Sequence, residues 1–425
     1  MPVTSSDIET FRFAIKDRYD VAKRVENLTL ADRPLMAMLS KDTDFSGDGT
    51  HIPLIFSNPQ GIAASGVQTA QNNATNLKGK KFILTAGDYN ASVYVGDKVI
   101  KQSRNNPGAF LKNKAAEMDG LYDQVADSLA TYIYGNSGNS IGAVATAASG
   151  TGPDEGNGAT DVITLTESTQ GMNFEVGMKL VGSANDGSDT SHTLLGGGSF
   201  TVEGIDRSIG ELYLTSGAAA VLDAGKFLFR EGDFRGNTSS FIFHGLSDFL
   251  WPDNNPPPIY GMTRTADKIR LAGATVDPAA LVGKSMEEKI RLLATQMTGV
   301  YKGKGASHGF LNPEDWDQLA TQLSAKGYRP FADSETRFGF EAISFSAGGK
   351  RIKLYADRYC PKGTCFLLRL QDWKLHSMDK LIHPIEEDGL TVLRGADNNN
   401  YEFRLVSYPS FSTCAPGWSG RVSVA

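Results

Sequence analysis

The chain is poor in cysteine and shows no segment that would carry it across a membrane. Its cysteines are Cys360, Cys365 and Cys414, and none belongs to a Cys-x-x-Cys pair. Three unevenly placed cysteines do not make a disulfide framework, which favours a reducing compartment. The amino terminus lacks the basic and apolar segments of a signal peptide, and no run approaches the roughly 18 apolar residues that a membrane span needs. We therefore expect a soluble protein that is not secreted and has no membrane partner.

Charge is also scarce. Only 21% of the residues are charged, and 42 basic against 48 acidic residues leave a net charge of −6. An acidic chain argues against a protein whose whole surface neutralises nucleic-acid phosphates. A length of 425 residues suggests about two to three structural units, and 40% hydrophobic residues are enough to build a core. The 46 glycines exceed the usual share of about 7% and predict many turns.

Sequence motifs for catalysis, calcium or nucleotides are incomplete. Residues 138–142 (GNSIG) match a nucleophile elbow, but no strand precedes them, so we interpret them as a Gly/Ser-rich linker. Residues 42–47 begin like a calcium loop, yet its twelfth position is Pro53 instead of glutamate. Residues 283–285 (GKS) resemble the end of a phosphate-binding loop, but Pro278 stands where that loop needs glycine. Ser285 is better placed as a helix cap.

The histidines form no metal-ligand pattern. They show no i, i+4 pair and no cysteine at ligand spacing, which indicates surface or hydrogen-bonded residues. The six are His51, His192, His244, His308, His376 and His383. The 48 acidic residues offer many carboxylate pairs, but spacing in the sequence does not locate any pair in space. We predict no catalytic residue, no metal site and no cofactor, and therefore no enzyme.

The first hundred residues combine an arm with a long polar loop. Residues 1–46 read as an extended arm with short helical pieces and little core of its own. Residues 50–56 (THIPLIF) and the alternating run 82–99 read as strands. The roughly 25 polar residues between them are long for an idle connection, since long loops are usually functional or disordered. We predict a projecting β-hairpin, which we call the flap.

Residues 107–134 give the clearest helical pattern. Apolar residues recur at spacings of three and four through this segment, as on one face of an amphipathic helix. They are Leu111, Ala115, Met118, Tyr122, Val125, Leu129 and Ile133. Asn106 can cap the helix, Pro107 suits its first turn and Gly135 ends it. At 1.5 Å per residue such a helix is about 40 Å long and would be a strut for the whole molecule.

Residues 136–232 differ from the rest in glycine content and charge. This segment of 97 residues holds 18 glycines and has a net charge of −8. Short strand-like runs alternate with Gly and Asp turns, which predicts a small inserted β-barrel or sandwich. The runs are 162–165, 178–181, 200–205, 211–214 and 227–229.

The remainder of the chain reads as α+β. Ser285 and Glu288 form a capping box ahead of one helix, and Asn312 with Pro313 starts a second. From Gly339 onward the pattern is almost entirely that of strands. We therefore expect helices and strands to be segregated along the chain.

One basic segment lies in the acidic chain. Eight basic residues between positions 78 and 114 face only two acidic ones. They are Lys78, Lys80, Lys81, Lys98, Lys101, Arg104, Lys112 and Lys114. Two interpretations stay open: a solvated face that balances acids elsewhere, or contact with an acidic partner surface or with phosphates. The first six are our candidates for contacts between subunits or with phosphates.

Three segments carry a resemblance to a known family. They are LNPEDW at 311–316, RYCPKG at 358–363 and YPSFSTCAPGWSGR at 408–421. With the order of arm, polar hairpin, long helix, β-rich insertion and α+β remainder, they resemble the major capsid protein of tailed double-stranded DNA phages, which has the HK97-type fold. In that family they correspond to the helix start of the axial domain, a strand-connecting segment and the closing strand.

The resemblance implies a division of the chain and a set of partners. Its parts would be an N-terminal arm (1–46), an E-loop hairpin with flanking strands (47–105), the spine helix of the peripheral domain (106–135), an inserted acidic β-rich domain (136–232), an approximate axial domain (233–340) and the remaining axial and peripheral strands (341–425). Hexamers and pentamers of the chain would enclose double-stranded DNA, contacted without sequence preference, in a virion assembled in the bacterial cytoplasm. A separate scaffolding protein and a portal would be partners, with a decoration protein as a further candidate.

Other interpretations remain open at this point. Within the same fold an encapsulin-like cargo shell is one alternative, and a surface or carbohydrate-binding protein built on the β module is another. Some family members also cross-link covalently through an E-loop lysine and an asparagine. Residues of the right type are Lys78, Lys80 and Lys81 with Asn398, Asn399 and Asn400, but no motif selects them.

Overall fold

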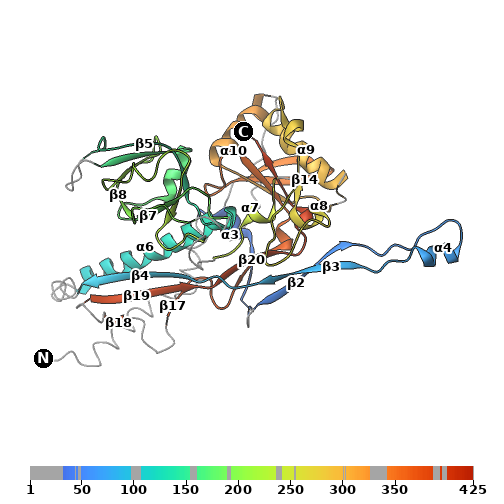
Figure 1. The fold of residues 1–425 in the computed structure, drawn as a ribbon, viewed down its shortest axis with the longest axis horizontal. Coiled ribbons are helices and arrows are strands. Elements are labelled where there is room, and N and C mark those ends of the chain that lie inside the picture. Colours follow the sequence, from blue (N-terminus) through green and yellow to red (C-terminus); the bar gives the residue numbers. More distant parts are fainter. Residues whose placement is uncertain are drawn as a thin grey trace.

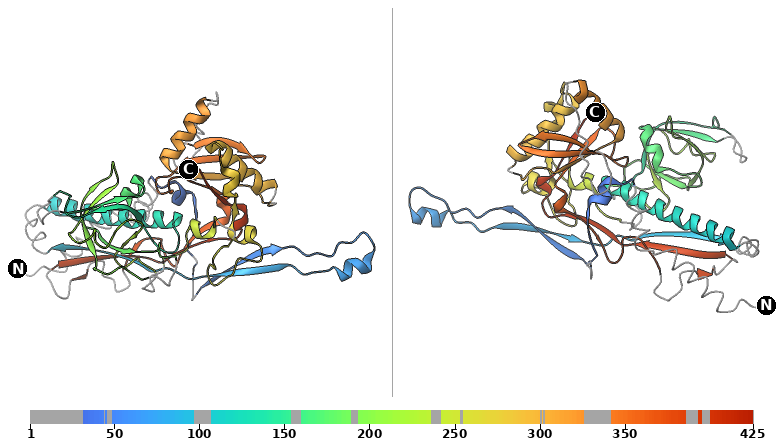
Figure 2. Two further views of the ribbon diagram at one scale, coloured as in Figure 1. Left: turned by 45° about the horizontal axis from the view of Figure 1, so that its top comes forward. Right: turned by 180° about the vertical axis from the view of Figure 1, so that it is seen from behind.

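The computed structural model shows an elongated molecule (Figure 1). It describes residues 32–43, 45, 49–96, 107–153, 160–188, 193–235, 242–252, 255–299, 301, 303–325, 342–385, 393–394 and 400–424. A long helix lies over a narrow sheet, a barrel and a helix-bearing sheet stand side by side above them, and a hairpin projects from the body (Figures 1 and 2). Among the described residues, none of the helices combines the length and apolar character that crossing a bilayer requires.

The longest helix is α6 (Pro107–Tyr134), which begins and ends where the sequence predicts. Tyr122, Val125, Leu129 and Ile133 of the predicted apolar stripe are all buried. The helix contacts strand β4 of a four-stranded sheet. The strands of this sheet are β4 (Tyr89–Gly96), β17 (His383–Pro384), β18 (Leu393–Arg394) and β19 (Asn400–Ser407). The helix is therefore the strut that the periodicity predicts.

The inserted segment forms a closed barrel, as predicted. Its strand order is β10-β5-β6-β9-β8-β7. The elements are β5 (Gly142–Ala148), β6 (Asp161–Leu165), the short helix η2 (Ser168–Asn173), β7 (Lys179–Ser183), β8 (Phe200–Asp206), β9 (Glu211–Leu214) and β10 (Phe227–Arg230). Five of the six strands lie where the sequence predicts them. The sequence did not predict β5, because Val144 is the only large apolar side chain in its GAVATAA run.

The upper sheet has helices between its strands, so the expectation that helices and strands are segregated along the chain is wrong. Its order is β11-β21-β15-β12-β14-β13, with β12 parallel to β14 and β11 parallel to β21. Its strands and helices are β11 (Ala274–Thr275), α9 (Met286–Gly299), β12 (His308–Leu311), α10 (Pro313–Ala325), β13 (Ala342–Ala347), β14 (Lys350–Ala356), β15 (Thr364–Leu368) and β21 (Gly420–Ser423). Parallel neighbours need a crossover, and a helix-bearing connection supplies it here.

The predicted caps of the two helices are present. Ser285 Oγ accepts from the backbone N–H of Glu288 at 3.4 Å, and the Glu288 carboxylate accepts from the backbone N–H of Ser285 at 2.8 Å. Asn312 Oδ1 accepts from the backbone N–H of Glu314 at 3.1 Å. Ser285 therefore caps α9, as the sequence predicts.

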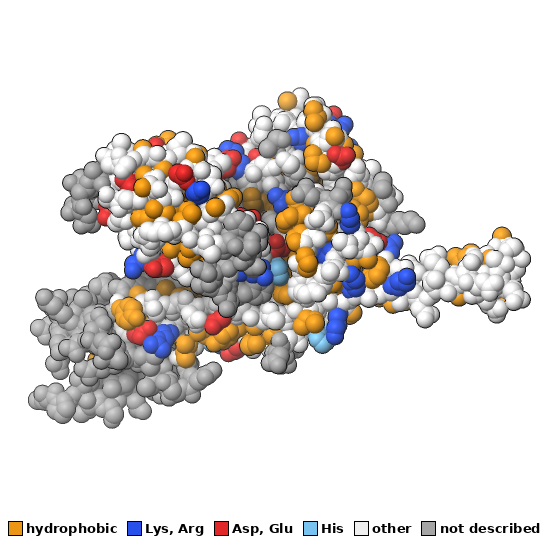
Figure 3. Space-filling view, in the orientation of Figure 1, with side chains coloured by type: hydrophobic (Ala, Val, Ile, Leu, Met, Phe, Trp, Pro, Cys, Tyr) orange, Lys and Arg blue, Asp and Glu red, His pale blue; other side chains and the backbone are white. Residues whose placement is uncertain are grey.

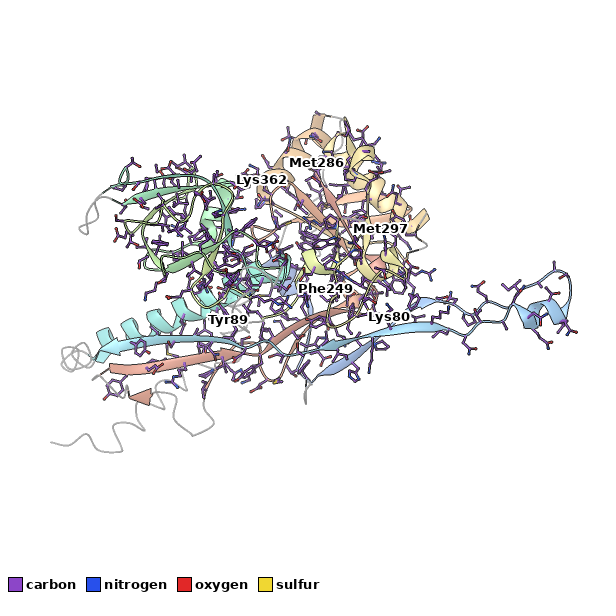
Figure 4. All side chains as sticks on the ribbon, viewed as in Figure 1. Lys80, Tyr89, Phe249, Met286, Met297 and Lys362 are labelled. Atoms are coloured by element: carbon purple, nitrogen blue, oxygen red, sulfur yellow. The ribbon has the colours of Figure 1, made fainter. Side chains whose placement is uncertain are left out.

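A small central sheet joins these parts. Strand β16 lies between β1, to which it is parallel, and β20, to which it is antiparallel. The surrounding elements are α3 (Pro34–Met38), β1 (Ser40–Asp42), α7 (Leu246–Phe249), α8 (Lys268–Ala272), η3 (Pro278–Leu281), η4 (Leu370–Asp372), β16 (Trp373–Ser377), β20 (Pro409–Thr413) and η5 (Pro416–Trp418). Trp373 stacks on Phe411 and meets the ring of Phe249 edge-on, so an aromatic cluster holds these elements together. Figure 4 shows Phe249 in the middle of the molecule.

The flap consists of β2 (Thr50–Ser57), α4 (Val67–Asn72) and β3 (Lys78–Leu84). The hairpin was predicted, whereas the short helix at its tip was not. The run 82–99, expected as one strand, is divided between two sheets: β3 ends at Leu84 and β4 begins at Tyr89. A Cβ at Gly87 would lie 1.9 Å from the carbonyl oxygen of Ile242, so this crossing of two backbones requires glycine.

Candidate assembly surfaces

The outer part of the flap has no core. No residue of α4 is buried. Ile62 and Val67 at the tip are 88% and 74% exposed, and Ile55, Leu77 and Ile83 along the strands are also exposed. These five account for half of the ten large apolar side chains that are strongly exposed among the described residues. A concentration of this kind on one projecting element (Figure 3 shows the flap extending from the body) is typical of an interaction surface.

The base of the flap, in contrast, is anchored firmly. Phe82 is completely buried and meets the rings of Phe249 and Tyr260 at centroid distances of 5.6 and 6.1 Å. Leu54 and Leu84 are buried beside it, and the Arg270 guanidinium donates to the carbonyl of Phe56. Because the base is fixed in the core, the tip is held away from the body instead of folding back on it (Figures 1 and 2).

Strand register sorts the flap into two faces. Ile52 is paired with Phe82 and Leu54 with Lys80, and these side chains share the inner face. On the outer face His51 pairs with Ile83, and Ile55 lies opposite Gly79, so apolar side chains point to solvent there. Because Gly79 has no side chain, Ile55 has no cross-strand side chain to pack against.

The described candidate lysines lie at the flap base, where they have different environments. The Lys80 ammonium donates to the carbonyl and the hydroxyl of Thr263, the latter at 3.0 Å, so Lys80 ties the flap to the body (Figure 4). Lys78 and Lys81 are exposed and form no ion pair with a residue that the structure describes. The flap holds no acidic residue from Gly49 to Gly87, so this region is positively charged. Lys78 and Lys81 therefore remain candidate contacts, whereas Lys80 also has a role within the chain.

Other candidates fall outside the description. Lys98, Lys101, Arg104, Asn398 and Asn399 lie beyond the described residues. Lys112, Lys114 and Asn400 belong to placed elements whose side chains there are not described. The contact and cross-linking hypotheses for them stay predictions.

A buried polar joint fixes α3 to the strut helix. Arg33 donates to Asp123 at 2.9 Å and to Asp127 at 2.5 and 3.0 Å, and its side chain is 2% exposed. Burial disfavours the charged guanidinium, but the charges and hydrogen bonds of these two carboxylates outweigh it and raise the pKa of Arg33. Arg33 is buried whereas Asp123 and Asp127 are partly exposed, and together they fix the start of α3 to the strut helix.

The same joint reaches the upper sheet through Asp357. Its carboxylate accepts from the Tyr134 hydroxyl at 2.8 Å and from the backbone N–H groups of Leu35 and Tyr359 at 3.2 and 3.0 Å. Burial raises the pKa of this carboxyl group despite those donors. No motif in the sequence marks Asp357, because its partners lie 322 and 223 residues away.

The barrel is attached to the strut helix by hydrogen bonds. The Tyr132 hydroxyl donates to Asp233 Oδ2 at 2.5 Å, and the Asn139 amide donates to the Asp233 carbonyl at 2.8 Å. The Arg230 guanidinium donates to the hydroxyls of Tyr89 and Ser128. Arg230 and Asp233, where the chain leaves the barrel, therefore hold it on α6, and Asn139 ties the entry of the barrel to Asp233.

The described histidines agree with the expectation of ordinary polar residues. His244 Nδ1 lies 2.6 Å from Asp248 Oδ2, His376 Nε2 lies 2.8 Å from Ser412 Oγ, and His383 Nδ1 lies 2.9 Å from the Lys380 carbonyl. His51 is exposed, and His192 lies outside the described residues. Within the described ranges no group of three His, Cys, Asp or Glu side chains is placed to hold a metal ion.

The fold and these contacts define a class of protein. It is an elongated α+β chain whose body is closed by polar joints and whose flap presents unpartnered apolar side chains. Exposed apolar side chains on one projecting element are typical of surfaces that contact another chain.

Comparisons with known proteins give structural likenesses only. No protein-family model and no curated protein matches the sequence. The chain is similar to one in the capsid asymmetric unit of cyanophage A-1(L), at 12% identity and a TM-score of 0.48, with 92% of each chain covered. It is also similar to a chain of the capsid of a native GTA particle, at 8% identity and a TM-score of 0.45, covering 93% of this chain and 90% of that one. A chain from the procapsid of satellite phage P4 shows 10% identity and a TM-score of 0.35, with 97% of each covered.

Proposed function

We propose that the protein is the structural subunit of an icosahedral capsid shell that encloses phage double-stranded DNA. The observation that carries the proposal is the flap: a hairpin anchored by Phe82 at its base and apolar and uncovered at its tip. A shell subunit needs such an element, because heterologous contacts close chains into rings while each chain reaches its neighbour. Hexamers and pentamers of this chain would be those rings.

The free energies of burial and of association favour a closed ring over a pair of chains. Full burial of five Ile, Leu or Val side chains contributes on the order of 7–15 kcal/mol before any cost is counted. Immobilising two chains costs about 4–15 kcal/mol. One flap contact alone is therefore marginal. In a closed ring every subunit both gives and receives a flap, so contacts accumulate while the last one closes the ring without adding a chain.

The parts of the chain take roles under this proposal. Residues 1–46 would be the N-terminal arm, 47–105 the E-loop with its flanking strands, 106–135 the spine helix, 136–232 the inserted domain, 233–340 the axial domain, and 341–425 the remaining strands. The boundary at 340 falls inside the six-stranded sheet, which takes β11 and β12 from one side and β13, β14, β15 and β21 from the other. Strands of both segments therefore belong to the axial part.

The proposal also assigns partners. The inserted domain would face outward, since its net charge of −8 would be repelled by packaged DNA, and a decoration protein would bind there if one exists. A separate scaffolding protein and a portal would take part in assembly in the bacterial cytoplasm. DNA would be contacted without sequence preference. The proposed role includes no catalytic step and no cofactor.

Deletion of residues 61–76 tests the proposal. The deletion removes Ile62, Val67 and α4 but leaves the paired strands and the buried base. We expect a folded chain with an unchanged melting temperature that forms no rings or shells in electron micrographs, whereas the complete chain forms them. Normal particles from the shortened chain would refute the role of the flap. A complete chain that stays monomeric with its scaffolding partner would refute the shell itself.

A further inference from the structure

The upper sheet carries a basic hollow at one end of its parallel strands. It is bounded by the segment before β12, the β13–β14 turn and the end of β15, and has a volume of about 710 Å³. A second hollow of about 420 Å³ adjoins it and shares Gly348, Lys350 and Arg351. The two are lined by five cations and by no aspartate or glutamate. The cations are Arg291, Lys304, Lys350, Arg351 and Arg369. In a chain of net charge −6 this is a local excess of positive charge.

Two of the cations form ion pairs, whereas no ion pair with a described residue is found for the other three. Arg291 pairs with Glu287 at 2.7 Å and Arg369 with Asp372 at 3.4 Å. Lys304, Lys350 and Arg351 are exposed and form no ion pair with any residue that the structure describes. Since unpaired cations that converge on a hollow attract anions, the excess charge is available to a ligand.

Glycines in the turns bring the cations together. Gly348 and Gly349 have φ values of +58° and +72°, as a two-residue turn between β13 and β14 requires, and a Cβ at Gly348 would lie 2.5 Å from the Ala294 carbonyl. Gly305, with a φ of +80°, leaves room for the stem of Lys350: a Cβ there would lie 3.1 Å from Lys350 Cγ. The Lys350 stem is thus packed on the loop before β12.

Trp418 positions two further cations. The Lys304 ammonium lies 4.6 Å and the Arg369 guanidinium 4.8 Å from the centre of its ring. Burial and the nearby Lys353 lower the pKa of His308 to about 4, so this lining residue is neutral at pH 7. The charge of the hollow therefore comes from lysine and arginine.

We propose that these two hollows form a binding site for phosphate groups, with a nucleic-acid backbone as the favoured source. The five cations extend over two connected hollows, more than a single phosphate ion would need. Lysine and arginine together with hydroxyls such as those of Thr298 and Ser307 are the usual phosphate-contacting groups. This site is separate from the flap and goes beyond the shell proposal, because a phosphate site requires no assembly.

The test compares two matched double variants of the full-length chain. K350Q/R351Q removes two unpaired cations of the hollow, and K284Q/K380Q removes two exposed lysines elsewhere, so both change the net charge equally. Binding of a fluorescent 24-base-pair duplex is measured by anisotropy against salt concentration. Loss of two phosphate contacts predicts a salt slope smaller by about 2 and an affinity lower by on the order of 50-fold at 0.1 M salt. The K284Q/K380Q variant should bind like the unchanged chain.

Competition experiments identify the ligand, and melting curves test whether the variants fold. Competition of the duplex by inorganic phosphate at millimolar concentration would show that free phosphate fills the site, whereas competition by polyphosphate alone would support a backbone. If poly-glutamate competes as well as polyphosphate at equal charge, the site recognises acidic protein segments and the proposal is overturned. Equal binding by the two double variants would also overturn it. Melting curves check the fold, and K304Q alone should reduce the salt slope by about 1 if K350Q/R351Q does not fold.

Discussion

The flap and the barrel look similar in composition but have opposite relations to solvent. Both are rich in glycine and small polar residues. The flap has no acidic residue, and the barrel segment has few basic ones. In the barrel Phe174, Val202, Leu212 and Leu214 are completely buried in the interior of a closed sheet. In the flap the apolar residues of the tip stand in solvent, and α4 buries nothing. The barrel buries its apolar side chains within the chain, whereas the flap leaves those of its tip exposed.

Sheet closure explains the difference. A closed barrel has no open edge, and its alternating side chains share one interior. A two-stranded hairpin has two edges and is at best marginally stable alone in water. The flap persists because its base is held by Phe82, so its outer part can remain extended without a core of its own. Exposing apolar side chains to water is unfavourable, so the flap tip is a candidate for contact with another molecule.

The largest expected effect is at the flap base. Phe82→Ala removes a fully buried ring that contacts Phe249 and Tyr260 and should lower the free energy of unfolding by about 3–5 kcal/mol. Urea denaturation measures this loss. The matched control is Ile83→Ala, one residue further on the exposed face, which should cost far less. Equal losses would mean that the base is not anchored in the core and that the flap is not held in place.

A smaller effect is expected in the barrel. Asp161 is completely buried, and its carboxylate accepts from the backbone N–H groups of Gly150, Gly217 and Ala219 at 2.8–2.9 Å and from Ser149 Oγ at 3.2 Å. Asp161→Asn leaves some of these buried donors without an acceptor and should cost about 1–3 kcal/mol. Urea denaturation at pH 7 checks this.

The pH dependence of the barrel tests the same carboxylate. Burial opposes the charge of Asp161, but the hydrogen bonds from Ala219, Gly150 and the others prevail and hold its pKa below the ordinary value of 3.8. A folded pKa below the unfolded one stabilises above pH 3.8, and this stabilisation is lost as pH falls through the folded pKa. The Asn variant should therefore lose less stability than the natural chain between pH 5 and 3. Exposed Asp223→Asn should change neither result, and identical acid profiles for all three proteins would contradict the role of Asp161.

Local patterns predicted what depends on local sequence. Helix α6 could be placed to the residue because an apolar stripe from Leu111 to Ile133 is preceded by Pro107, which suits a first turn, and followed by Gly135. Five barrel strands were visible because branched and aromatic residues alternate between Gly and Asp turns. Strand β5 was not predicted because Ala and Gly make up five of its seven residues and Val144 is its only large apolar side chain. The flap was predictable from the length of its polar tract.

Pairings between distant segments could not be predicted. Strand β4 pairs with β19, and Arg33 meets Asp123, across separations that leave no mark in one sequence. The interleaving of α9 and α10 with parallel strands was missed for the same reason. Among the candidate lysines, sequence could not separate Lys80, which binds Thr263, from the exposed Lys78 and Lys81. The basic hollow was invisible because its cations come from separate turns.

The smallest effect on the stability of the single chain, and the sharpest test of the comparison, is at the flap tip. Ile62→Ser with Val67→Ser changes side chains that are 88% and 74% exposed, so the free energy of unfolding should shift by no more than about 0.5 kcal/mol. Assembly should nevertheless fail, because these side chains would lose the apolar contact with a neighbour. The matched pair on the barrel, Val176→Ser with Ile209→Ser, is also strongly exposed but should assemble normally. Electron microscopy and urea denaturation of both pairs decide the matter: assembly by the tip variant, or failure of the barrel variant alone, would assign the contact surface to the barrel and reverse the roles of the two elements.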